Sequence, residues 1–301
     1  MNSVTVASPA KLNLYLAVTG RRVDGFHNLV SLVAQVKWGD VLKVEWRKAK
    51  GGSSEAGDGF SLECSDPGVP MDGSNLVLRA ARAFRAASGW REDVSFSLEK
   101  RIPMGAGLGG GSSNAVAALR ALNHLAGGPL GDGALAGLAA QLGSDCALFL
   151  HEGPVAMRGR GEIIEALGPV ARLRGRKVLI FKPGFGIATA EAYRALARGS
   201  NYLPAGEAEA RLAGWLGDPN APAAELLFNS FERVAFAKYL ALPTLLDDLR
   251  RRFDLAPLMT GSGSACFAFP REGTGAFSDA VAAAIREAWG PSAFVVETEI
   301  A

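Results

Sequence analysis

The chain has 301 residues, of which 49% are hydrophobic and 21% are charged, a composition typical of a globular protein of one large or two smaller domains. Its 32 Lys and Arg against 30 Asp and Glu leave a formal net charge of +2 without a dense basic patch, which argues against a nucleic-acid-binding protein. No signal peptide and no apolar run of ~18 residues is visible, and three widely spaced cysteines exclude a full disulfide framework, so a cytoplasmic protein with reduced thiols and no membrane partner is expected.

The first half of the chain predicts strands interrupted by helices. Leu12, Leu14 and Leu16 alternate with other residues, which is the period of a strand with one buried face. The predicted strands are 10–18, 30–36, 41–46, 60–66, 94–100 and 146–150, with a turn at 37–40 and a hairpin over 155–167. The predicted helices are 75–88, the segment after Ser113, and 133–143. A polar loop is predicted at 48–59, and no function is assigned to it.

From about residue 176 the pattern restarts. Strands are predicted at 177–183, 256–261, 265–270 and 293–300, and helices at 189–197, 211–217, 225–239, 243–253 and 277–289. Strands and helices mix without strict βαβ alternation, so an α+β fold is favoured over a doubly wound sheet. The restart predicts two domains, residues 1–165 and 166–301.

One segment predicts an anion site. Seven of the nine residues from Gly105 to Ser113 are Gly or Ser, and a helical pattern follows at once. Glycine lets backbone N–H groups approach an anion closely, and a helix N-terminus adds unpaired N–H groups and a positive partial charge. Ser112 and Ser113 could cap the helix or turn toward the anion. The segment therefore predicts a phosphate-binding loop, called the glycine loop below.

Common phosphate motifs do not account for this loop. Residues 105–110 match GxGxxG, but the next strand and its acidic residue, which a dinucleotide-binding fold needs, are missing. The P-loop lysine and the protein-kinase HRD and DFG segments are absent too. A glycine turn without any ligand is the remaining alternative, and it is disfavoured because so long a glycine run is costly to order.

Residues 103–123, PMGAGLGGGSSNAVAALRALN, resemble the signature of the GHMP kinases, a family that includes galactokinase and the homoserine, mevalonate and phosphomevalonate kinases. Residues 9–36, 142–153 and 258–269 agree as well, so the resemblance covers nearly the whole chain. It implies a two-domain α+β fold, with an N-terminal domain like ribosomal protein S5 and a ferredoxin-like C-terminal domain. The extension GRRVDGFH, residues 20–27, is not general to the family and implies the branch whose small-molecule substrate carries a cytidine diphosphate group.

The resemblance also implies a cofactor, ATP with Mg²⁺, and a catalytic pair, Lys11 and Asp145. Asp145 would take the proton of the substrate hydroxyl, and Lys11 would hold the carboxylate and offset developing charge. From position alone, Lys11 could be a solvated strand lysine and Asp145 a turn carboxylate. The implied ATP-binding residues are Pro103, Met104, Gly105, Ala106, Gly107, Leu108, Gly109, Gly110, Gly111, Ser112 and Ser113, with Asn75 and Lys100 on the adenine side. The three histidines show no metal-ligand spacing, so no protein metal site is predicted.

The implied substrate residues come from three segments. Phe26 would stack on cytosine, His27 would read its hydrogen-bonding edge, and Tyr193 would cover its other face. The remaining residues are Asn13, Thr189, Gly261 and Ser262. The last two lie in a second glycine turn, residues 260–264, which from sequence alone could be a tight hairpin. Residues 229–232, NSFE, depart from the family's more usual Asn-Asp-x-Glu, which puts a supporting contact in doubt.

Three other functions compete with this reading. Another GHMP kinase, of the homoserine or mevalonate type, is disfavoured by the turn at 24–27. A nicotinamide-dependent dehydrogenase is disfavoured by the missing βαβ unit, and a nucleic-acid-binding protein on an S5-like fold by the near-neutral charge. The expected partner is a small molecule, and the expected assembly is a monomer or a weak homodimer.

Overall fold

The computed structural model describes residues 2–48, 59–199, 202–270 and 277–301, so most of the polar loop predicted at 48–59 lies outside the described residues. The chain divides into two compact units. The first unit comprises Met1–Ala10, Gly39–Met104 and Gly109–His151, and the second comprises Lys11–Trp38, Gly105–Leu108 and Glu152–Ala301. Two long strands, β1 (Ser3–Arg21) and β2 (His27–Arg47), contribute to both units. The units therefore alternate along the chain, and the contiguous domains 1–165 and 166–301 stay a prediction.

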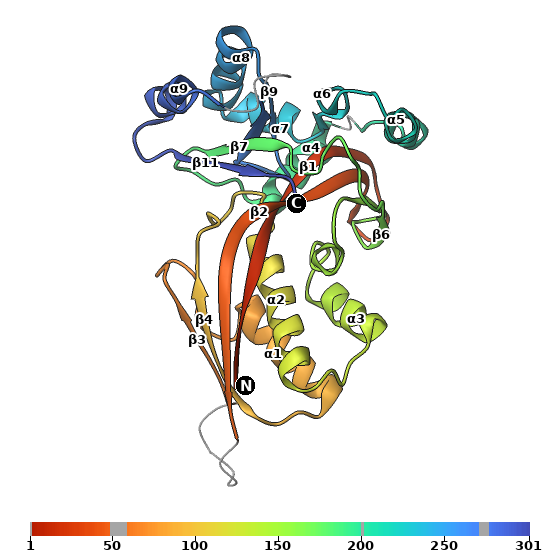
Figure 1. Cartoon of the computed structure of the whole chain (residues 1–301). Coiled ribbons are helices and arrows are strands. Elements are labelled where there is room, and N and C mark those ends of the chain that lie inside the picture. Colours follow the sequence, from red (N-terminus) through yellow and green to blue (C-terminus); the bar gives the residue numbers. More distant parts are fainter. Residues whose placement is uncertain (1, 49–58, 200–201, 271–276) are drawn as a thin grey trace. The chain divides into compact units, whose positions relative to one another are not determined.

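The first unit places three helices on one side of its strands (Figure 1). Strand β3 (Phe60–Cys64) runs parallel to β4 (Asp93–Glu99), and β4 pairs antiparallel with the last part of β2. Helices α1 (Leu76–Ser88), α2 (Gly110–Leu125) and α3 (Asp132–Leu142) pack against one another. Every residue of α2 from Ser113 to Leu119 is buried, so this helix, which follows the glycine loop, is fixed inside the unit.

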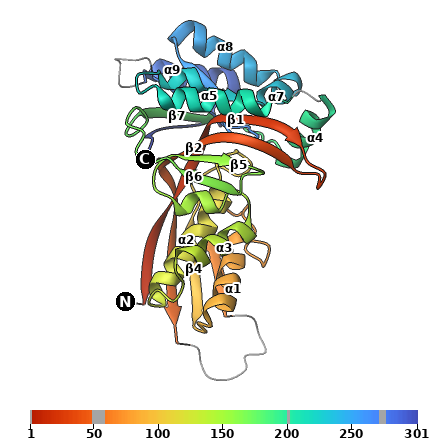
Figure 2. The same ribbon diagram turned by 90° about the vertical axis from the view of Figure 1, so that its right-hand side faces the viewer.

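The second unit contains an antiparallel sheet in the order β11-β7-β10-β9, formed by Phe294–Glu299, Lys177–Lys182, Cys266–Phe269 and Ala256–Met259. Helices α8 (Ala241–Phe253) and α9 (Asp279–Trp289) pack together, and Figures 1 and 2 show both on the same side of β7. The other elements are α4 (Thr189–Gly199), α5 (Ala205–Gly217), α6 (Ala223–Leu226), α7 (Glu232–Lys238), the hairpin β5 (Val155–Arg158) with β6 (Ile163–Ala166), and β8 (Phe228–Asn229), which runs parallel to β1. The mixture of antiparallel sheet and helices confirms the predicted α+β class.

Three local predictions are wrong. The predicted strands 30–36 and 41–46 are one strand, β2, and Gly39 in the predicted turn is instead a point of close approach, because a Cβ there would lie 2.1 Å from the Ser8 carbonyl oxygen. The predicted strand 146–150 is a turn followed by the 3₁₀ helix Ala147–Leu150, since a short apolar run carries no decisive period. The predicted helical stretch 225–239 is broken by β8. Within the described part of the chain, no helix is both long and apolar enough to cross a membrane.

Candidate active site

The glycine loop turns through left-handed glycines. Gly105, Gly107 and Gly109 have φ angles of 60°, 76° and 73°, a region that side-chain-bearing residues rarely adopt. Helix α2 begins directly afterwards at Gly110, and no side chain caps its first turn. The first N–H groups of such a helix are left for water or an anion, which is the arrangement expected of a phosphate cradle.

The two serines after the glycines do not cap the helix, so the capping alternative is wrong and the contact with an anion stays a prediction. The Ser113 hydroxyl accepts a hydrogen bond from the Ser8 hydroxyl at 2.8 Å. Ser112 hydrogen-bonds the buried thiol of Cys146, whose pKa is raised mainly by burial. Both serines therefore contact side chains of the first unit and not the free N–H groups of α2.

Within the second unit, the first half of the glycine loop packs against the second glycine turn. A Cβ at Gly107 would lie 2.4 Å from the Thr260 carbonyl oxygen, and one at Gly261 would lie 2.9 Å from the Gly107 carbonyl oxygen. The Lys11 N–H donates to the Leu108 carbonyl oxygen at 3.0 Å. The two turns thus meet backbone to backbone, at a distance that only glycine permits.

Three of the predicted residues are brought together at this contact. Lys11 and Asn13 are buried on β1, and the Lys11 ammonium donates to Asn13 Oδ1. The Asn13 N–H donates to Thr260 Oγ1 at 2.9 Å, and its side-chain amide donates to Ser31 Oγ at 3.0 Å. A Cβ at Gly261 would lie 3.4 Å from Lys11 Nζ. A buried ammonium is therefore held against the second glycine turn.

Asn229 holds the second glycine turn in place. Its side-chain amide donates to the carbonyl oxygens of Met259 at 2.6 Å and Gly261 at 2.8 Å. Ser230, which stands where the family pattern has Asp, accepts a hydrogen bond from the Val18 N–H at 3.0 Å. The departure from the pattern therefore leaves the support of this turn intact. In the same region the hydroxyls of two predicted substrate residues, Thr189 and Ser262, lie 2.9 Å apart.

Three further predicted residues, Asp145, Asn75 and Lys100, also belong to the first unit, and their roles stay predictions. Asp145 is half-buried in the turn between α3 and the 3₁₀ helix, while Lys11 belongs to the second unit. Asn75 caps α1 by accepting from the Val77 N–H at 2.9 Å. Lys100 forms an ion pair with Asp40 at 2.5 Å. The last two side chains thus have structural partners before any nucleotide is considered.

A pocket of about 530 Å³ in the second unit brings together three predicted substrate residues. This volume lies within the range of small-molecule sites. Its lining includes Phe26, His27 and Tyr193, and four arginines that the sequence analysis missed, namely Arg21, Arg160, Arg194 and Arg198. The sequence could have indicated two of them. Arg194 and Arg198 stand four residues apart on α4, beside Tyr193, and so share one face of the helix.

His27 lines this pocket and carries an unsatisfied polar atom. The residue is 8% exposed, and its Nε2 is buried without a hydrogen-bond partner within the described residues. Burial, and next the charge of Arg21, lower the pKa of His27 below its usual 6.5, so the imidazole is neutral near pH 7. A buried unpaired nitrogen costs stability unless a ligand satisfies it.

An aromatic ring packs directly on the imidazole of His27. The ring of Tyr193 stacks on His27 with centroids 4.9 Å apart, and meets Phe231 edge-on at 4.8 Å. Phe26 is 50% exposed, and the Arg160 guanidinium lies 4.9 Å from its ring centroid. Flat rings, an imidazole with one unpaired nitrogen and several guanidinium groups can together accept an aromatic base linked to a negatively charged group.

Comparisons with known proteins agree with this geometry. The family model described as the GHMP kinases N terminal domain matches residues 75–153. Curated 4-diphosphocytidyl-2-C-methyl-D-erythritol kinases of Protochlamydia amoebophila and Thermotoga maritima are 37% and 39% identical to this chain, over 89% and 88% of its length and 84% and 92% of theirs. A crystal structure of 4-(cytidine 5'-diphospho)-2C-methyl-D-erythritol kinase matches with a TM-score of 0.76 at 34% identity, covering 99% of this chain and 100% of that chain. Homoserine kinase from Cytophaga hutchinsonii, with a TM-score of 0.74 at 17% identity over 100% of this chain and 95% of that one, shares the fold alone.

The fold, the uncapped helix after a glycine loop and the matched domain define a GHMP-type small-molecule kinase. The sequence identity to the two curated kinases is above one third over most of each chain, which narrows this class to one branch of the family. The chain belongs to the 4-diphosphocytidyl-2-C-methyl-D-erythritol kinase family. This confirms the predicted family and branch, and it decides against the dehydrogenase and nucleic-acid-binding alternatives.

Proposed function

We propose that this chain transfers the γ-phosphoryl group of ATP to the 2-hydroxyl of 4-diphosphocytidyl-2-C-methyl-D-erythritol, in the non-mevalonate pathway to isoprenoid precursors. The observation that carries the substrate is the buried, unpartnered Nε2 of His27 in a pocket lined by aromatic rings and arginines. A cytosine ring offers a flat face to Phe26 and a hydrogen-bonding edge to His27. The arginines match the negative charge of a diphosphate.

The glycine loop fits the phosphates of ATP. Left-handed glycines and an uncapped helix N-terminus leave backbone N–H groups for phosphate oxygens. When bound with Mg²⁺, ATP supplies the phosphoryl group to be transferred. No group of three or more His, Cys, Asp or Glu suited to a metal occurs among the described residues, so Mg²⁺ is expected to rely mainly on phosphate oxygens and water.

The chain's own residues would handle the proton and the charge. Asp145 would accept the proton of the substrate hydroxyl as general base. Lys11, whose ammonium is buried and hydrogen-bonded to Asn13, would offset negative charge that develops during transfer. Thr189 and Ser262, whose hydroxyls contact each other, would line the path of the acceptor alcohol.

The test compares substrates and pocket variants of the purified protein. With ATP and Mg²⁺, we expect turnover of the cytidine substrate and very little of free methylerythritol, because the remote binding energy that orients the hydroxyl is lost. CMP or CDP should compete and UMP should not, since stacking alone cannot distinguish the bases and the edge contact at His27 can. Phe26→Ala should raise KM strongly, and the control Phe26→Tyr should be nearly silent. Equal turnover of mevalonate or homoserine would refute this substrate and leave the kinase class standing.

A further inference from the structure

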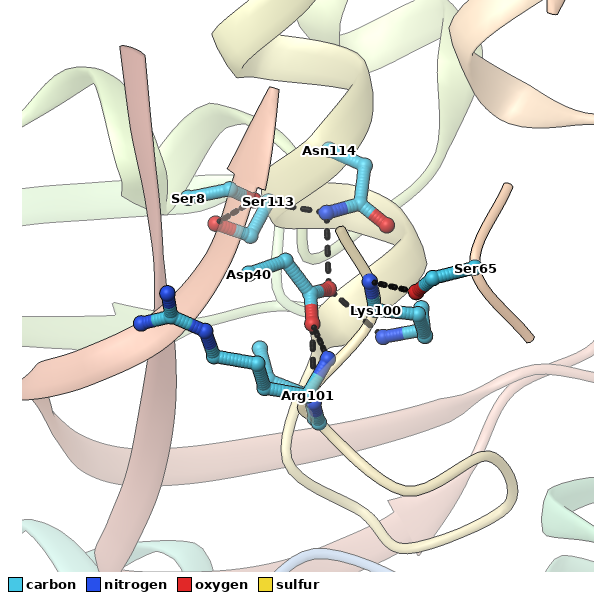
Figure 3. Close-up of polar contacts among 8 residues, drawn as sticks. Ser8, Asp40, Ser65, Lys100, Arg101, Ser113 and Asn114 are labelled. Carbon is cyan, nitrogen blue, oxygen red and sulfur yellow. Dashed lines mark hydrogen bonds and ion pairs between the residues drawn. The ribbon is translucent and has the colours of Figure 1, made fainter. Parts of the chain in front are cut away.

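Asp40 is a buried carboxylate with every acceptor position in use (Figure 3). Its side chain is 0% exposed. Oδ1 accepts from the backbone N–H groups of Arg101 at 2.7 Å and Ile102 at 2.8 Å. Oδ2 accepts from Lys100 Nζ at 2.5 Å and from the Asn114 side-chain amide at 2.8 Å. Two oxygens with four donors are saturated, so the carboxylate has no lone pair left for a ligand.

These four donors stand on both sides of the glycine loop. Lys100, Arg101 and Ile102 lead into the loop, and Asn114 lies near the start of the helix that follows it. The contact extends through hydroxyls, because the Asn114 amide also donates to Ser8 Oγ at 2.7 Å, and Ser8 Oγ donates to Ser113 Oγ at 2.8 Å. One carboxylate therefore joins the chain before the loop to the chain after it.

Close packing leaves this arrangement little freedom. A Cβ at Gly110 would lie 3.0 Å from Lys100 Nζ and 3.1 Å from Ile102 Cγ2, so the first residue of α2 is pressed against the segment that enters the loop. Gly39, next to Asp40, passes Ser8 where no Cβ would fit. Gly39 therefore has no room for a Cβ, and a Cβ at Gly110 would be tight against the segment that supplies three of the four donors.

We propose that Asp40 is a positioning residue for phosphoryl transfer, which fixes the two ends of the glycine loop so that the first N–H groups of α2 meet the phosphates. The proposal rests on the proposed function in taking this loop as the ATP phosphate cradle. It also reassigns Lys100: its ammonium, with a side chain 7% exposed, is bound to Asp40, and its influence on ATP passes through that carboxylate. Neutralising Asp40 would leave a buried ammonium without its counter-charge and would release both ends of the loop.

The experiment compares three variants of the full chain. Asp40→Asn keeps the shape and removes the charge. Asn114→Ala removes the amide that links α2 to Asp40 and to Ser8. Glu99→Gln is the matched control, because Glu99 forms an exposed ion pair with Arg101 in the same segment. Binding of a non-hydrolysable ATP analogue and of CDP is measured by calorimetry, below the melting temperature of every variant. We expect Asp40→Asn to weaken the analogue about tenfold to a hundredfold and Asn114→Ala severalfold, with Glu99→Gln and all CDP affinities unchanged, because a displaced cradle loses aligned contacts.

A purely structural role would lower the melting temperature without changing analogue affinity, and that result in both variants would overturn the proposal. Loss of CDP binding together with analogue binding would indicate general loss of structure and would also overturn it. If Asp40→Asn does not fold, Asn114→Ala decides alone by the same comparison. Failure of the parent to bind the analogue would instead refute the proposed function, which separates the two failures.

Discussion

A single methyl group at Gly107 tests whether the two glycine turns pack backbone to backbone. An alanine there would keep a left-handed φ of 76°, which costs roughly 1–2 kcal/mol for a residue with a Cβ. Its Cβ would lie 2.4 Å from the Thr260 carbonyl oxygen and 3.2 Å from the Gly263 nitrogen, so the backbone must move. Overpacking of this kind adds about 1–3 kcal/mol, and the expected loss is about 2–5 kcal/mol in the free energy of unfolding.

Thermal and urea unfolding of the protein without nucleotide measure this loss. At about 2–4 °C per kcal/mol, Gly107→Ala should lower Tm by at least ~4 °C. Gly111→Ala is the control from the same loop, because its Cβ would meet only Leu76 Cδ1, at an ordinary 3.5 Å. Exchanging glycine for alanine within a helix is neutral or favourable by about 0.5–1 kcal/mol, so this variant should not melt below the parent. Equal Tm values for Gly107→Ala and the parent would refute the backbone packing.

Three further predictions concern the chemistry, the stability and the pocket. Asp145→Asn should lower kcat by about 10²–10⁴ and leave binding of an ATP analogue nearly intact, and activity within a few-fold of the parent would remove Asp145 as the base. Burial raises the pKa of Glu232 above its usual 4.5, so stability is full below pH 4.5 and is lost as the pH rises through the raised pKa. Glu232→Gln retains an oxygen for the Met259 N–H, so its Tm should exceed that of the parent at about pH 7 and equal it at about pH 4; a gain of the same size at both pH values would contradict this cause. Arg194→Gln should weaken CDP more than cytidine in calorimetry, while Arg22→Gln, outside the pocket lining, should change neither; equal weakening of both ligands would argue against a diphosphate contact.

The sequence predicted the elements that carry a clear period or a family motif. The alternation of Leu12, Leu14 and Leu16 predicted the strand β1, and the glycine run followed by Ala and Leu predicted the helix α2. The single buried face predicted for β1 is wrong, because every residue from Ala10 to Val18 is buried. Motif resemblance placed Phe26, His27 and Tyr193 at one site, and the structure brings all three into one pocket. Their roles toward cytosine stay predictions.

What the sequence could not supply is the long-range partner of a buried polar group. Asp40 follows a glycine, and this pair predicted a turn. The groups that donate hydrogen bonds to the Asp40 carboxylate lie 60 to 74 positions further along the chain. Gly39 has no local reason to be glycine, because the obstacle is the Ser8 carbonyl on another strand. Such residues are specified by contacts between distant segments, and neither period nor spacing records those contacts.

A glycine substitution in the glycine loop can lower ATP affinity even where the glycine does not contact the nucleotide. At Gly107 the Thr260 carbonyl oxygen leaves no room for a Cβ, and at Gly110 a Cβ would be tight against Lys100 and Ile102, before any ligand binds. Substitutions at these positions disturb protein packing and reduce binding indirectly. Gly111 differs, because a Cβ there would disturb no protein neighbour beyond its contact with Leu76, while the residue lies in the uncapped first turn of α2.

Gly111→Ala therefore separates the two causes. If the first turn of α2 cradles phosphate, the added methyl group should lower the affinity for the ATP analogue about tenfold. Tm without nucleotide should not fall below that of the parent, and the affinity for CDP should be unchanged. Calorimetry measures the affinities of this variant for the ATP analogue and for CDP, and a melting curve measures its Tm. Unchanged analogue affinity would mean that the phosphates do not approach this turn. The glycines would then serve packing alone, and the cradle would have to be sought elsewhere in the chain.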